Sequence, residues 1–500
     1  MLRRNIIANY LGQGWVALMG LIFIPVYIRY LGIEAYGLIG LYSAIQVWLA
    51  VLDLGMTPAL NRELARSRAR IRSAESLRDL VVTFEIICYS LALAIGLVLW
   101  FASGWLATEW LNTSNLDVGV VATTLQIIGM VVALRFVEGL YRGGLLGLHR
   151  HVWLNGTVSF FATLRAVGAI CILALVDPSI QAFFWWQAGV SLTTVLTLAY
   201  AMRHYLPRAS RSGVFSPWAF TDVWRFAGGV LVTTILALLI TQIDKILLSR
   251  MLSLETFGVY MFAATVAGSL YQLVGPLAQS YYPRFSELIA KGDESALADT
   301  YHQAAQLMTV ATVPAGLLLI VFSEPILYVW TGDAKLARNA SQLVAILALG
   351  NVLNGWMNIP YILQLASGWS SFSARVNAVG AVILAPAIFL IVPVYGMVGA
   401  AWVWVVVNLG YVLVAMRYMH RRLLPNHRMS WYANDLFIPS LMPGLVVALS
   451  MLLGPLSGSA WVVVPWVAAT GAIAALGAVV GASRLRLSLF HQLQSLATSR

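Results

Sequence analysis

The sequence predicts an all-α polytopic membrane protein with about fourteen transmembrane helices. The 500 residues are 60% hydrophobic and only 10% charged, too little polar surface for a soluble chain of this length. Most of the 31 Lys and Arg residues fall in alternate gaps between apolar segments. Cytoplasmic loops of membrane proteins carry such an excess. We therefore expect a multi-pass protein with both termini in the cytoplasm.

Each apolar segment of about 20 residues is interpreted as one span. The expected helices lie near 6–30, 36–60, 80–101, 118–147, 153–176, 180–203, 223–250, 256–285, 301–330, 338–366, 373–392, 396–419, 433–453 and 461–483. Arg-rich loops follow the second, sixth and twelfth of these, whereas 102–119 and 176–179 contain no Lys or Arg. A missed or extra helix would invert this alternation downstream, and the alternation does not invert.

A weak internal repeat indicates two lobes. Leu31, Glu34 and Gly37 match Leu252, Glu255 and Gly258, and Asn155 matches Asn377 at nearly the same offset. Six helices per repeat is an even number, so the halves would be parallel repeats related by an axis along the membrane normal. The expected organisation is an N-terminal six-helix lobe (1–205), a cytoplasmic linker (206–221), a pseudo-symmetric second lobe (222–428), a helix pair (429–483) and a cytoplasmic tail (484–500).

The composition also excludes several classes of function. The net charge of +11 is carried by short juxtamembrane loops, where membrane lipids and topology account for it without a nucleic-acid partner. Cys88 and Cys171 lie in apolar segments, so no disulfide framework or metal cluster is expected. The chain has no GxxxxGK[ST], HExxH or GxSxG string. We expect no catalysis and no cofactor, only a proton or ion gradient as the energy source.

Charges inside the spans are the candidate site, because they are costly in a bilayer and normally face a protein interior or a wet cavity. Arg135 and Arg165 lie on consecutive predicted helices, each roughly 20 Å from the cytoplasmic end at 1.5 Å per residue. Glu138 is one turn from Arg135 on the same face. One interpretation is a cationic patch that binds a phosphate or pyrophosphate. The alternative is a structural Arg135–Glu138 pair, with Arg165 satisfied by helix carbonyls.

Three further charges are weaker candidates. Asp53, together with Glu138, is a candidate for coupling to a proton or ion, although packing near the polar helix ends explains Asp53 equally well. Asp244 and Lys245 are adjacent near the outer end of the seventh predicted helix. Such an opposite pair is either a structural latch or an external gate.

Several motifs resemble a known family. They are LGIEAYGL at 31–38, DLG at 53–55, the basic stretch after the second helix, LLGLHRHVWLN at 145–155 and ITQIDKILLSRMLSLETFGVYMFA at 240–263. The chain resembles bacterial polysaccharide flippases of the Wzx type, in the MATE-like multidrug/oligosaccharidyl-lipid/polysaccharide exporter superfamily. The resemblance covers most of 5–290.

The resemblance implies a two-lobed fold of fourteen helices in the bacterial inner membrane. The implied substrate is an undecaprenyl-pyrophosphate-linked oligosaccharide, moved across the membrane for lipopolysaccharide O-antigen, capsule or exopolysaccharide biosynthesis. A polysaccharide polymerase and a chain-length regulator are the implied protein partners. Arg135 and Arg165 fit the cationic cavity expected of the family in character, without an invariant motif.

Two rival functions remain at this point. A cation-coupled multidrug antiporter of the same superfamily would place acidic groups deep in the first lobe. A membrane glycosyltransferase or polysaccharide polymerase would depend on outward acids such as Glu109 or Asp117. A peptidoglycan-precursor flippase is a closer variant of the first interpretation.

Overall fold

Long apolar helices make up nearly all of the described chain. The computed structural model describes residues 2–53, 55–66, 73–207, 210–217, 235, 238–454 and 459–487. Over these residues there is no strand, and the one isolated bridge joins Asn112 to Ser253. The predicted all-helical class is confirmed. The first part of the predicted seventh helix, 223–234, lies outside the described residues, as do 488–500 of the predicted tail.

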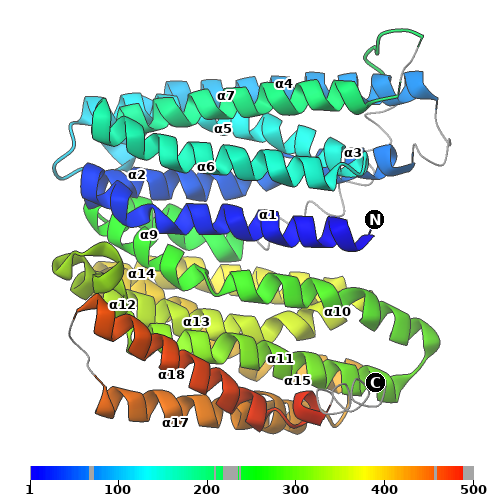
Figure 1. Cartoon of the computed structure of the whole chain (residues 1–500), viewed down its shortest axis with the longest axis vertical. Helices are drawn as coiled ribbons and strands as arrows, with labels where there is room; N and C mark the ends of the chain where they lie inside the picture. The colour runs from blue at the N-terminus through cyan, green and yellow to red at the C-terminus, as the bar shows by residue number, and fades with distance from the viewer. Residues whose placement is uncertain are drawn as a thin grey trace. The chain divides into compact units, whose positions relative to one another are not determined.

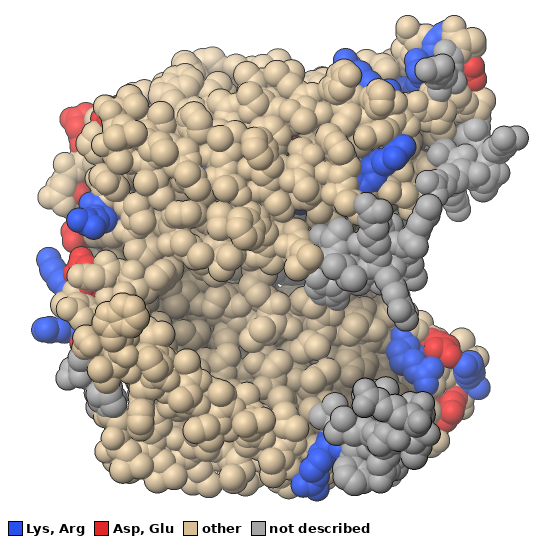
Figure 2. Space-filling model, in the orientation of Figure 1, with Lys and Arg blue, Asp and Glu red and all other residues tan. Residues whose placement is uncertain are grey.

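Among the described residues, nine helices are long and apolar enough to cross a membrane, or eleven if two bent pairs each count as one span. On the face shown in Figure 2, the Lys, Arg, Asp and Glu side chains gather toward the left and right edges, and the surface between them is uncharged. This face therefore presents an uncharged band of the kind that hydrocarbon requires. The count of fourteen and the cytoplasmic termini stay predictions.

The chain divides into two compact units, Met1–Gly258 and Val259–Arg500. The first unit contains α1 (Leu2–Ile22), α2 (Ile24–Leu52), α3 (Met56–Arg66), α4 (Ala74–Trp105) with a π-helical end (Leu106–Trp110), α5 (Val118–Gly147), α6 (His151–Leu175), α7 (Ile180–Tyr205) and a helix over 238–251. In this bundle α5 packs against both α4 and α7, and α1 packs along α6 (Figure 1).

The second unit begins within α9 (Leu254–Gly268). It continues with α10 (Tyr271–Lys291), α11 (Glu294–Val321), α12 (Ser323–Thr331), α13 (Ala334–Ala366) and α14 (Ser370–Gly410), then the π-helix η3 (Tyr411–Ala415) and α15 (Met416–Leu423). The last elements are α16 (Arg428–Ser430), the π-helix η4 (Trp431–Phe437), α17 (Ile438–Leu453) and α18 (Ala460–Gly481). α11 packs against α13 on one side and against α17 and α18 on another.

Two glycines make the tight turns between successive spans. Gly32 has φ 81° and Gly396 has φ 57°, a region that side-chain-bearing residues rarely adopt. They separate the legs of two helices that otherwise run on without a break, α2 and the 41-residue α14. A straight helix of 41 residues would be about 62 Å long, twice the thickness of a hydrocarbon core. Gly32 lies between the first and second predicted helices, and Gly396 is the first residue of the predicted twelfth helix.

Several predicted helices are broken where hydropathy gives no signal. The first bends by 45° between Ile22 and Ile24, ahead of Pro25, which cannot donate to the preceding turn. The second, expected over 36–60, ends at Leu52, and α3 begins at Met56. The eighth, expected over 256–285, bends by 42° between Gly268 and Tyr271.

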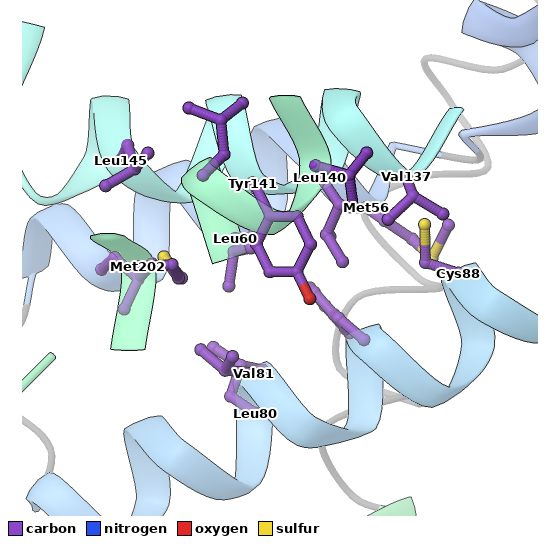
Figure 3. Packing of buried hydrophobic residues seen from close by; sticks show 14 of the residues in the cluster. Met56, Leu60, Leu80, Val81, Cys88, Val137, Leu140, Tyr141, Leu145 and Met202 are labelled. Carbon is purple, nitrogen blue, oxygen red and sulfur yellow. The ribbon is translucent and has the colours of Figure 1, made fainter. Parts of the chain in front are cut away.

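A buried apolar cluster holds α3, α4, α5 and α7 together (Figure 3). Leu60, Leu80, Tyr141 and Met202 each contribute a side chain that is at most 1% exposed. Gly147 permits the close approach of α5 to α3, because a Cβ at this position would lie only 2.6 Å from the Asn61 carbonyl oxygen of α3. This packing fixes the rotation of α5, the helix that carries the candidate site.

Candidate functional site

Three charged residues of α5 lie on one face of that helix. Arg135, Glu138 and Arg142 are three and four residues apart, which is the spacing of side chains on one helical face. α5 begins at a well-formed cap, because the Asp117 carboxylate accepts hydrogen bonds from the backbone N–H groups of Gly119 (2.7 Å) and Val120 (3.3 Å). The buried apolar cluster that packs α5 against α3, α4 and α7 fixes the direction in which these charged side chains point.

The Glu138 carboxylate is the common partner of three guanidiniums. Arg135 Nη1 donates to Glu138 Oε2 at 2.8 Å, and Arg165 Nη2 of α6 lies 3.7 Å from the same oxygen. Arg142 Nη1 lies 3.7 Å from Oε1. The structure thus brings together Arg135, Glu138 and Arg165, which the sequence placed at one level. Three positive charges and one negative leave this cluster with a net charge of +2.

The guanidiniums are more accessible than the acid they surround. The Glu138 side chain is 4% exposed, against 15% for Arg165 and 25% for Arg135. At 1.5 Å per residue, Arg135 lies about 18 Å along α5 from its end at Gly147, and Arg165 about 21 Å along α6 from its start at His151. Both are therefore near the middle of spans that cross a core about 30 Å thick.

Arg165 has unused hydrogen-bonding capacity. A guanidinium has five N–H donors, yet Arg165 Nε is buried without a partner among the described residues. Its Nη2 makes a long contact of 3.4 Å with the Ser191 hydroxyl of α7. A buried donor without a hydrogen-bond partner costs about 1–3 kcal/mol. Binding of an acceptor group at Arg165 would therefore be favourable.

Aromatic and amide side chains of α2 border the cluster. The Tyr42 hydroxyl is within hydrogen-bonding reach of the Arg135 guanidinium and accepts from Gln46 Nε2 at 2.7 Å. The Tyr42 ring also packs edge-on against Phe184 of α7, with ring centroids 5.4 Å apart. The surround therefore combines apolar rings with neutral hydrogen-bonding groups.

A second polar network lies further along α5. The Tyr141 hydroxyl donates to Glu85 Oε1 of α4 at 2.7 Å, and the Tyr89 hydroxyl is 2.6 Å from that of Tyr141. Arg203 of α7 lies 3.5 Å from Glu85. These contacts tie α4, α5 and α7 together at the edge of the apolar cluster, so we interpret the network as structural.

The other sequence-predicted residues have local partners. Asp53 accepts from the Thr57 hydroxyl at 2.6 Å and from the Thr57 backbone N–H at 3.2 Å, so it stabilises the start of α3. Lys245 Nζ lies 3.1 Å from Asp244 Oδ1 and donates to the Thr241 carbonyl at 2.8 Å. Asp53, Asp244 and Lys245 are not among the partners that the structure records for the Glu138 carboxylate.

The acids of the glycosyltransferase alternative are placed differently. Glu109 is exposed in the π-helical end that follows α4, and Asp117 is occupied as the N-cap of α5. Over the described ranges, no group of three or more His, Cys, Asp or Glu side chains has a geometry that could hold a metal ion.

Sequence reasoning missed several residues of the site. Arg142 is four residues from Glu138, so helical spacing could have included it; the loop-charge pattern instead assigned it to the cytoplasmic surface. Tyr42 and Ser191 carry no such signal, because their positions depend on how α2 and α7 pack around α5.

Comparison with known proteins places the chain in a family. The family model described as "Polysaccharide biosynthesis protein" matches residues 2–289, and the MatE model matches 230–390. A protein named "Putative O-antigen transporter" from Shigella flexneri is 21% identical over 80% of this chain and 93% of its own length.

Two solved structures show the same fold. One described as lipid II flippase MurJ in an inward closed conformation has a TM-score of 0.69 at 13% identity, covering 97% of this chain and 99% of its own. An inward-facing MATE family multidrug transporter has a TM-score of 0.66 at 14% identity, covering 84% of this chain and 94% of its own. The chain is therefore a multi-pass membrane protein of the polysaccharide biosynthesis protein family, the Wzx-type polysaccharide-transport branch of the MATE-like superfamily.

Proposed function

We propose that this protein is a flippase that moves undecaprenyl-pyrophosphate-linked oligosaccharide repeat units across the bacterial cytoplasmic membrane by alternating access. The product would feed O-antigen, capsule or exopolysaccharide assembly. The observation that carries the proposal is the net positive charge of the Arg135–Glu138–Arg142–Arg165 cluster near the middle of two spanning helices.

Diphosphate chemistry suits this cluster. A lipid-linked pyrophosphate is a compact, multiply charged anion, and guanidinium forks contact phosphate oxygens bidentately. Arg165 Nε has no partner in the part of the chain that the structure describes, and Arg135 is a quarter exposed. In the proposed cycle these two residues hold the pyrophosphate, and Glu138 orients them. The neutral Tyr42 and Gln46 would border the sugar path, and the polyprenyl tail would stay in lipid.

The relatives support the lipid-linked substrate class. The Shigella flexneri protein carries the name of an O-antigen transporter, and the MurJ structure is described as that of a lipid II flippase. The two named relatives are a transporter and a flippase, which agrees with a role in transport rather than catalysis. A polymerase and a chain-length regulator remain proposed partners.

The coupling and gating residues are also proposals. Asp53 and Glu138 are candidates in the first unit for binding a coupling proton or ion, and the Asp244–Lys245 pair is a candidate gate. Each has a structural partner in this conformation, so a role in the cycle requires that those contacts break in another state. A proton or ion gradient is the proposed energy source.

A cationic-drug antiporter is the second candidate, favoured by the MatE match over 230–390. A drug cation would have to enter a cluster with a net charge of +2, which opposes its binding. The cationic cluster therefore favours an anionic substrate.

Transport in reconstituted vesicles tests the proposal. The wild type, Arg135→Ala, Arg165→Ala and the double variant would be compared for flipping of an undecaprenyl-pyrophosphate-linked N-acetylhexosamine. Arg338→Ala, at a 74%-exposed side chain, is the control. We expect flipping by the wild type and the control, and its loss in the double variant. Equal flipping by all the folded proteins would contradict the charge-patch mechanism. Export of a cationic dye without flipping would favour the antiporter.

A further inference from the structure

The second unit contains a fully buried acid–base pair that the proposed substrate site does not use. His302 of α11 and Asp435 of η4 are both 0% exposed, and His302 Nδ1 is hydrogen bonded to Asp435 Oδ2. Asp435 Oδ1 accepts from Gln306 Nε2 at 3.1 Å. Ionisable side chains buried this completely are costly unless they are paired and hydrogen bonded.

The pair is connected to the protein surface by one more imidazole. His302 Nε2 lies 2.9 Å from Nδ1 of His427, which is only partly buried in the turn between α15 and α16. The three side chains therefore form a line from a carboxylate without solvent access to an imidazole at the edge of the unit. They do not converge on one point as metal ligands would.

The hydrogen-bond geometry permits a proton order. With Asp435 ionised and both imidazoles neutral, His302 Nδ1–H donates to the carboxylate, and His302 Nε2 accepts from His427 Nδ1–H. A proton that arrives at His427 Nε2 lets His427 release its Nδ1 proton to His302 Nε2. His302 becomes an imidazolium beside the carboxylate, and His427 becomes neutral in its other tautomer. One proton enters, one moves inward, and neither ring has to rotate.

We propose that the His302–Asp435 pair is the proton-binding site of the transport cycle and that His427 is its entry relay. This inference rests on the proposed function, and it places coupling in the second unit rather than at Asp53 or Glu138. The basic residues at 417–428 predict that this end is cytoplasmic, so protons would exchange with the cytoplasm in the present conformation.

A relay residue such as His427 should be neutral when it is not carrying a proton in transit. Burial lowers the pKa of His427, and the neighbouring His302 lowers it further. His427 is therefore expected to pass a proton on rather than to hold it.

The His302–Asp435 pair lies where three helical segments meet, so a change in its protonation can alter the packing of those segments. Gln306 Nε2 donates to Asp435 and to the Asn434 carbonyl, while Gln306 Oε1 accepts from the backbone N–H groups of Arg484 (3.0 Å) and Leu485 (3.4 Å). One amide thus links α11, η4 and the segment after α18. A change of charge on the His302–Asp435 pair alters the acceptor that holds this amide in place.

Other ionisable groups surround the relay and set its field. Arg484 pairs with Asp299 of α11, and Tyr301 hydrogen bonds to His420 Nε2 at 3.0 Å. Asp299 and Arg484 act on the relay residues directly. Tyr301 and His420 are coupled to the relay, and Arg428 and Tyr432 act on these two neighbours. Of these, only Arg484 and Arg428 are permanently cationic, and Asp299 is the counter-ion of Arg484.

Proteoliposomes provide the test, with undecaprenyl-pyrophosphate-linked N-acetylhexosamine as the probe and pyranine as the internal pH reporter. Gradient-free exchange of the probe between leaflets is measured first, then its stimulation by a pH gradient and the accompanying proton flux. The variants are Asp435→Asn, His302→Gln and His427→Ala. The exposed His204→Gln is the control.

We expect Asp435→Asn and His302→Gln to keep gradient-free exchange while losing stimulation and proton flux. His427→Ala should lose both at neutral pH and regain them when free imidazole is added, a rescue that a purely structural His427 would not show. Stimulation by the gradient in folded Asp435→Asn or in His427→Ala without imidazole would overturn the proposal. Absence of exchange in the wild type would instead overturn the proposed function. If both buried variants unfold, the surface variant His427→Ala still decides.

Discussion

The Glu138 carboxylate on α5 lies 3.7 Å from the Arg165 guanidinium on α6, while Arg135 on its own helix donates to the same carboxylate oxygen at 2.8 Å. One acid thus ties together two guanidiniums from consecutive spans and leaves an excess of positive charge. Of the two alternatives that the sequence left open, the structural Arg135–Glu138 pair is present. Arg165 Nε has no partner among the described residues, and anion binding by the cluster stays a prediction.

Replacing the acid should destabilise the first unit. In Glu138→Gln three guanidiniums lose the one carboxylate that they contact among the described residues, and removing a charged partner from a buried site costs about 1–3 kcal/mol. We expect a lower melting temperature in detergent. Glu109→Gln, at an exposed acid, should melt like the wild type. A Glu138→Gln protein as stable as this control would show that the carboxylate does not balance the cluster.

Arg165→Lys separates charge from geometry. Lysine keeps the positive charge and loses the planar fork that contacts two phosphate oxygens at once. We expect flipping activity between those of the wild type and Arg165→Ala, with Arg338→Lys at the wild-type level. If Arg165→Ala flips the probe as fast as the wild type, Arg165 does not contact the substrate.

The approach of α3 to α5 depends on the absence of a side chain at Gly147. In Gly147→Ala the new Cβ would meet the Asn61 carbonyl oxygen at 2.6 Å and the Leu64 Cβ at 2.9 Å, and such overpacking costs about 1–3 kcal/mol. Gly139 on the same helix has no atom within 4 Å of a Cβ, so Gly139→Ala should be neutral or stabilising. Comparison of the two melting temperatures measures this contact, and equal values would refute it.

Within the first unit, two glycines permit a close approach between α2 and the start of α9. A Cβ on Gly37 would lie 2.6 Å from the Leu254 carbonyl oxygen, and a Cβ on Gly258 would meet the Ile33 carbonyl oxygen. We expect Gly258→Ala to lower the melting temperature and Gly268→Ala, on the same helix with open space around it, to leave it unchanged. A Gly258→Ala protein as stable as Gly268→Ala would mean that α9 and α2 do not pack this closely.

Hydropathy predicted the helical class and chain breaks near 31–35 and 393–395, close to the Gly32 and Gly396 turns, because long apolar runs in a bilayer have few alternatives to helices. The breaks after Ile22 and Leu52 were missed, since a bend leaves the apolar composition of a span unchanged. Position along a helix placed Arg135 and Arg165 at similar depths, and the spacing of three residues placed Glu138 beside Arg135.

Contacts between helices could not be predicted from the sequence. Whether Arg165 faces Glu138 depends on the rotation of α6 against α5, which side-chain packing decides. His302 and Asp435 are 133 residues apart in the chain, and neither belongs to a local motif. An acid within a predicted span is a signal that could have singled out Asp435.

The central claim is that Arg135 and Arg165 bind a diphosphate inside the membrane. Equilibrium binding of undecaprenyl pyrophosphate to the protein in nanodiscs tests it directly. The wild type is compared with the Arg135→Ala/Arg165→Ala double variant after both are shown to be folded. Hydrogen bonds to charged groups contribute about 1.5–3 kcal/mol each, so we predict an affinity loss of roughly tenfold or more. Equal affinity of the two folded proteins would contradict the account.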